Sequence, residues 1–133
     1  MKGIFEFELE GNKKVGFKYG TYGISISCEK EGCAVDELFR RCGMPYLTKG
    51  ADGKPEVRAD QPKLQSLLHL VYGAAVHYAE DNNIPVDFKV STVSNWLDEI
   101  GEEKLKPMMV DSLTQYIPKN LKSLAETGEK ATA

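Results

Sequence analysis

The sequence predicts an α+β, mainly α domain, in which an N-terminal β-hairpin packs on a bundle of about four to five short helices. Two runs of β-forming residues flank a Gly-Asn turn near the N-terminus, and the segments after them repeat their apolar residues at helical spacing. The chain has 133 residues, which suits one domain, and its 41% apolar and 28% charged residues are ordinary for a globular protein. We expect one globular domain over residues 1–118. A disordered tail should follow over residues 119–133, because that segment has few apolar groups to bury.

The predicted hairpin joins residues 4–9 to residues 15–19 through a turn at Gly11 and Asn12. Apolar and aromatic side chains at every second position give each strand one apolar face. An isolated two-stranded hairpin is only marginally stable in water, so this face must pack on helices.

Residues 21–31 fit two structures. The alternation of apolar and polar residues over positions 24–28 is typical of a strand, whereas Ile24, Cys28 and Glu31 share one face of a helix that Gly32 would end. We favour the helix, mainly because of the family resemblance described below.

The longest proline-free apolar segment covers residues 63–80 and predicts the central helix. Its apolar stripe follows the i, i+3, i+4, i+7 spacing and comprises Leu64, Leu67, Leu68, Val71, Ala74, Ala75 and Tyr78. Leu70 and Val76 lie off this stripe, so the helix is apolar most of the way round. Shorter helices are predicted over residues 35–42, 91–101 and 102–117.

Residues 44–62 contain the prolines and glycines that interrupt regular structure. A loop this long in a compact domain is either mobile or functional. We expect a mobile surface loop at about residues 44–62. The alternative is a partner-binding loop with Tyr46 and Leu47 as its anchors.

Composition excludes several classes of function. The net charge of −3 argues against a large basic footprint for nucleic acid. No apolar run approaches the roughly 20 residues that span a bilayer, and acidic residues interrupt the apolar N-terminus, which is unlike a signal peptide. Three cysteines without a paired spacing favour free thiols in a reducing compartment. We therefore expect a cytoplasmic protein that binds neither nucleic acid nor membrane.

The sequence shows no catalytic, cofactor-binding or metal-binding motif. His69 and His77 are separated by eight helical residues, or about 12 Å, too far to chelate one ion together. Neighbouring carboxylates such as Asp98 and Glu99 point in different directions on a helix and are typical of a solvated face. We expect no cofactor and a protein that is not an enzyme.

The order of the segments is similar to that of a known family. The hairpin leads into FKYGTYGISISCEKEG and then VDELFRRCG, followed by LLHLVYGAAVHYAE, VSTVSNWLDEIG and a last segment ending in YIPKN. This order resembles the tail assembly chaperones of long-tailed bacteriophages and related prophages, over about residues 3–120. The individual motifs are weak, and the specificity lies in their order and spacing. The long segment 44–62 departs from the tighter family pattern.

The resemblance implies a non-enzymatic chaperone that binds the helical tape measure protein during tail assembly in the bacterial cytoplasm, with the tail tube protein as a second expected partner. Candidate partner-binding residues are the apolar surplus of the central helix, the methionine pair of the last helix and the two loop anchors: Leu70, Tyr72, Val76, Met108, Met109, Tyr46 and Leu47. The alternative for these apolar side chains is an ordinary core or homo-oligomer contact. The alternative functions are a generic interaction or structural protein of a mobile element and a small DNA-binding regulator.

Overall fold

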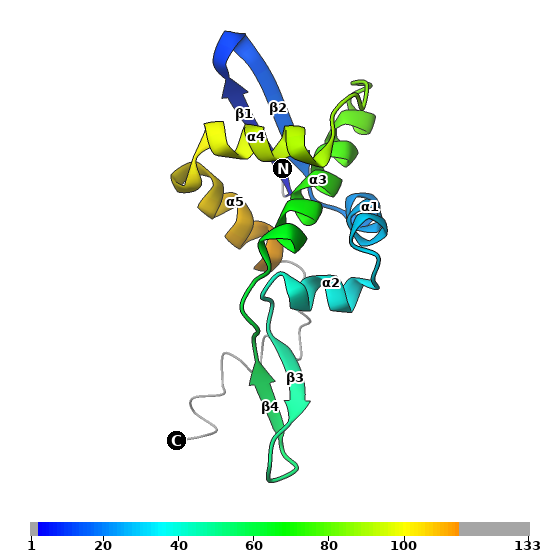
Figure 1. The fold of residues 1–133 in the computed structure, drawn as a ribbon, viewed down its shortest axis with the longest axis vertical. Coiled ribbons are helices and arrows are strands. Elements are labelled where there is room, and N and C mark those ends of the chain that lie inside the picture. The colour runs from blue at the N-terminus through cyan, green and yellow to red at the C-terminus, as the bar shows by residue number, and fades with distance from the viewer. Residues whose placement is uncertain (1–2, 115–133) are drawn as a thin grey trace.

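The computed structural model describes residues 3–114 and is an α+β fold that is mainly helical, as predicted. Five helices and two hairpins follow one another along the chain (Figure 1). Their bounds are β1 (Ile4–Leu9), a 3-10 turn (Glu10–Asn12), β2 (Lys13–Lys18), α1 (Thr21–Glu31), α2 (Val35–Arg41), β3 (Tyr46–Lys49), β4 (Pro55–Arg58), α3 (Leu64–Asp81), α4 (Val90–Ile100) and α5 (Glu102–Thr114). The predicted end of the last helix and the predicted tail lie outside the described residues.

The N-terminal hairpin is confirmed. β1 and β2 pair antiparallel with Phe5 opposite Phe17, and the turn places Gly11 and Asn12 at φ 75° and 59°, a region that Gly and Asn tolerate best. Phe17 is fully buried, and β2 packs on α3 while β1 contacts α4. The hairpin is therefore stabilised by the helices that its apolar side chains contact.

Residues 21–31 form the favoured helix, α1, rather than a strand. α1 packs along α3 at close range, because Gly23 and Gly73 face each other and Ser27 fits between the helices. The buried Ser27 hydroxyl donates to the carbonyl oxygens of Gly23 at 3.0 Å and Leu70 at 3.2 Å. Small residues thus bring α1 against the centre of α3.

α3 is the central helix. It is covered by α1 along one side and by β2 and α4 elsewhere, and α2 contacts it as well (Figure 1). Its buried residues are Ser66 in the first turn and most of the middle and C-terminal half: Leu70, Val71, Tyr72, Gly73, Ala74, Ala75, Val76, Tyr78 and Ala79. From Leu70 onward, the apolar character on several sides of this helix is therefore explained by the elements that cover it within the chain.

The expectation of a loop without regular structure over residues 44–62 is wrong. β3 and β4 form an antiparallel hairpin with Leu47 opposite Val57, and the turn between them includes Gly53 at φ 77°. Pro55 begins β4, where a missing backbone N–H is tolerated. In Figure 1 this hairpin extends away from the helices.

Candidate functional site

Four of the predicted partner-binding residues belong to the core and do not form a binding surface. The exposed fractions are 1% for Leu70 and Met108, 6% for Val76 and 9% for Tyr72. All four side chains join the main hydrophobic cluster. Three of them lie on α3, which α1, β2 and α4 cover, and Met108 lies on α5. The prediction that these four residues contact a partner is therefore wrong. They make ordinary core contacts, which was the alternative.

The remaining three predicted residues lie at the surface, in two separate places. Met109 is half-buried on α5, where its sulfur lies 3.9 Å from the Tyr19 hydroxyl. Tyr46 and Leu47 lie on β3, and Leu47 is 42% exposed. The structure therefore does not bring the methionine pair and the two β3 residues into one site.

An open groove of about 640 Å³ lies between the first half of α3, the end of α4 and the face of α5. Its apolar lining comes from all three helices: Leu64, Leu67, Leu68, Val71, Leu97, Leu105 and Met109. This volume falls within the roughly 300–1,000 Å³ range of ligand pockets in proteins, and the lining is predominantly apolar. The groove is the strongest candidate for a functional site in the part of the chain that the structure describes.

The groove uses the part of the α3 stripe that the fold leaves uncovered. Leu64 is 74% exposed, Leu67 and Leu68 are half-buried, and Val71 is buried at the inner end. These four residues follow the i, i+3, i+4, i+7 spacing of one helical face. The sequence identifies this stripe, but the predicted partner-binding residues of the same helix, Leu70, Tyr72 and Val76, lie on its other sides.

The rim of the groove is polar at the corner between α4 and α5. Asp98 lies in the last turn of α4 and Glu102 in the first turn of α5, on either side of Gly101, which takes φ 91°. Both carboxylate side chains are exposed, and Lys106 follows one turn later on α5. One end of an apolar groove is thus marked by two acidic groups.

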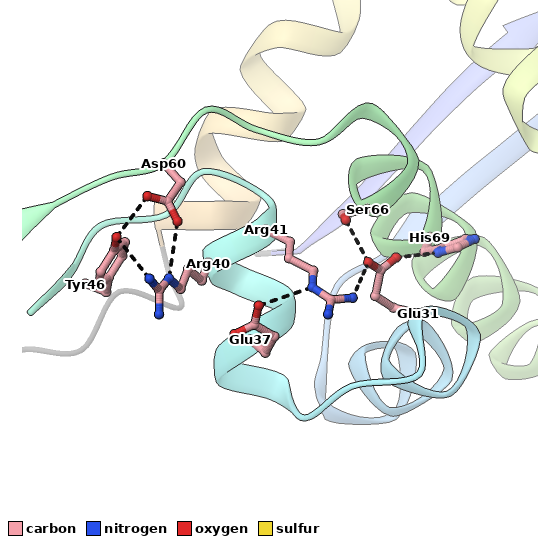
Figure 2. A network of polar contacts seen from close by, with 8 residues as sticks. All are labelled: Glu31, Glu37, Arg40, Arg41, Tyr46, Asp60, Ser66 and His69. Atoms are coloured by element: carbon pink, nitrogen blue, oxygen red, sulfur yellow. Dashed lines mark hydrogen bonds and ion pairs between the residues drawn. The ribbon is translucent and has the colours of Figure 1, made fainter.

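A separate polar network is centred on Glu31, at the end of α1 (Figure 2). Arg41 Nη1 and Ser66 Oγ each donate to its Oε2 at 2.8 Å, and His69 Nδ1 lies 2.6 Å from its Oε1. The side chain is only 9% exposed. Burial alone would raise the pKa of Glu31, but the hydrogen bonds from Arg41, His69 and Ser66 outweigh burial and lower the pKa to about 2.

A second polar group holds the base of the β3–β4 hairpin (Figure 2). The Tyr46 hydroxyl donates to Asp60 at 2.8 Å, Arg40 Nε donates to the same carboxylate at 3.2 Å, and the guanidinium lies 4.1 Å from the Tyr46 ring centre. The hydrogen bonds from Tyr46 and Arg40 lower the pKa of Asp60. The hydroxyl of Tyr46, a predicted anchor for a partner, therefore already donates a hydrogen bond within the chain.

The polar groups of the Glu31 network lie outside the groove. Ser66 and His69 both bond to the Glu31 carboxylate, and neither they nor Glu31 line the groove. Within residues 3–114 no group of three or more His, Cys, Asp or Glu side chains is placed to hold a metal ion. The three cysteines are free thiols, as predicted, and burial raises the pKa of Cys42 to about 12.

The helices of the described part are either too short or too polar to cross a membrane. No protein-family model, no curated protein and no solved structure matches this chain. The groove and its rim are therefore interpreted from their own geometry and chemistry.

Proposed function

We propose that this protein is a non-enzymatic tail assembly chaperone that binds the tape measure protein during phage tail morphogenesis, in the cytoplasm of the bacterial host. The observation that supports the proposal best is the open apolar groove between α3, α4 and α5. The order of sequence segments, which resembles that of the tail assembly chaperone family, supplies the identity of the partner.

The groove has the form that a helical client requires. A tape measure protein is a long helical chain, and an amphipathic helix places its apolar face in a groove through side chains at i, i+3 or i+4 and i+7. The α3 stripe offers leucines at matching intervals, and Met109 on α5 adds a flexible side chain that adapts to different apolar partners. Covering the groove would remove the exposed Leu64 and the half-buried leucines from water, which favours association.

The second expected partner, the tail tube protein, would need a surface outside the groove. The β3–β4 hairpin extends from the helices and carries the exposed Leu47 (Figure 1). A two-stranded hairpin has unpaired backbone groups on its outer edges, which are suited to pairing with a strand of a partner. We assign this hairpin to the second contact.

Co-expression with the tape measure protein of the same phage or prophage tests the proposal. The chain should increase the soluble fraction of the tape measure protein, and Leu64→Asp should remove most of that gain. Val35→Asp is the matched control, because Val35 is also an exposed apolar residue at the first position of a helix but lies outside the groove. An unchanged soluble fraction with the wild-type chain would refute the proposed function, and equal effects of the two variants would refute the role of the groove.

A further inference from the structure

The acidic corner of the groove distinguishes among its possible occupants. Four carboxylates fall within six residues at the junction of α4 and α5, and no cation lies among them: Asp98, Glu99, Glu102 and Glu103. Glu99 is already used, since its carboxylate accepts the backbone N–H of Glu10 at 2.7 Å. Asp98 and Glu102 line the groove itself, and within the described part of the chain neither has an ion-pair partner.

An occupant that covers the groove must also compensate these two carboxylates. A helix laid along the leucines would take Asp98 and Glu102 partly out of water, and a carboxylate that loses water without gaining a cation or donor opposes binding. Lys106 is the single cation in the lining, one turn from Glu102 along α5. A second copy of this chain has a net charge of −3, so overall it is repelled by the acidic corner.

We propose that the groove selects an amphipathic helix that carries Lys or Arg at the end lying over Asp98 and Glu102, with apolar side chains at i, i+4 and i+7 seated between α3 and α5. This inference rests on the proposed function and specifies which segments of the client are bound. The leucines supply most of the affinity, and the two carboxylates set the orientation and preference, because rim charges contribute more to specificity than to affinity.

Two synthetic helical peptides of about 20 residues test the inference with the full chain. They share one apolar stripe and differ only at one end, where the first has two lysines and the second has two glutamates. We expect the lysine peptide to bind roughly 5- to 10-fold more tightly at low salt, which lies within the range that two exposed ion pairs can supply. The preference should shrink at about 0.5 M salt, where such pairs are screened.

Paired variants separate the charge effect from the apolar contact. Asp98→Asn with Glu102→Gln should abolish the preference while the apolar stripe still binds. Glu29→Gln with Asp36→Asn removes the same charge at exposed positions outside the groove and should leave the preference intact.

Each remaining outcome has a defined meaning. Equal affinity for the two peptides, or a preference that survives loss of Asp98 and Glu102, overturns the inference. Failure of both peptides to bind also overturns it, and the proposed function stands if the chain still keeps the tape measure protein soluble. Self-association that Leu64→Asp abolishes identifies a second copy as the occupant and overturns the inference. If the chain prefers the lysine peptide but does not keep the tape measure protein soluble, the proposed function is refuted. The inferred preference of the groove for a helix with a basic end still holds in that case.

Discussion

Replacing Glu31 by glutamine tests whether the buried polar network stabilises the fold through the charge of its carboxylate. The folded-state pKa of Glu31 is about 2, below the ordinary value of 4.5, because three hydrogen-bond donors surround the ionised form. A lowered folded-state pKa means that ionisation favours the folded protein. This stabilisation is complete above pH 4.5 and is lost as the pH falls toward 2.

The size of the effect follows from the two pKa values. The difference between 4.5 and about 2 corresponds to about 3 kcal/mol of unfolding free energy at pH 7. Arg41 is 31% exposed, so solvent screening brings the expected cost of Glu31→Gln to about 2–3 kcal/mol at pH 7. At pH 3 much of the wild-type advantage is gone, and the same substitution should cost about 1 kcal/mol.

Urea denaturation of both proteins at pH 7 and pH 3 measures this difference. Glu37→Gln is the matched control, because Glu37 pairs with the same Arg41 at 3.2 Å but is 45% exposed. An exposed pair of this kind contributes about 0.5 kcal/mol or less. A cost for Glu31→Gln that does not change between pH 7 and pH 3, or an equal cost for Glu37→Gln, would refute the reasoning.

Three further predictions concern the core and its thiols. Gly73→Ala should lower the unfolding free energy by about 1–3 kcal/mol, measured by thermal denaturation, although alanine is the better helix former, because the new methyl group would overlap Ser27. Leu70→Ala should cost about 2–5 kcal/mol in urea denaturation, whereas Leu64→Ala should change stability by less than about 0.5 kcal/mol and act only on client binding. In a variant whose other two cysteines are serine, Cys42 should react with a thiol reagent at pH 8 only after unfolding, because burial raises its pKa to about 12; fast reaction of the native protein would contradict this.

Local patterns predicted most of the elements, because each signal lies within a few residues. The turn at Gly11 and Asn12 located the first hairpin, and Gly32 located the end of α1, where its N–H bonds to the Cys28 carbonyl at 2.7 Å. The second hairpin was missed because prolines and glycines dominated the interpretation of residues 44–62. β-forming residues around Leu47 and Val57, separated by a glycine-containing turn, were the signal that could have identified it.

The site was less predictable, because it depends on contacts between distant segments. Glu31, Arg41 and Ser66 meet from three different helices, and no local spacing connects them. Likewise, periodicity shows that Leu70 and Leu64 both lie on an apolar helix, but only the neighbouring elements decide which of them is covered. The distinction between core and binding surface is a property of tertiary packing.

The division of α3 into two halves explains how one small domain can combine a rigid core with an open apolar surface. The C-terminal half is enclosed by α1, β2 and α4, and its small residues permit the close approach of α1 at Gly73. In the N-terminal half one face is left uncovered, between α4 and α5, and Leu64 and Leu68 line the groove there. Val71 is 2% exposed and also lines the groove, so it joins the two regions. Because Val71 connects the groove wall to the packed core, we expect the half-buried Leu67 and Leu68 to lose less conformational freedom when the groove is covered than leucines on a flexible surface would.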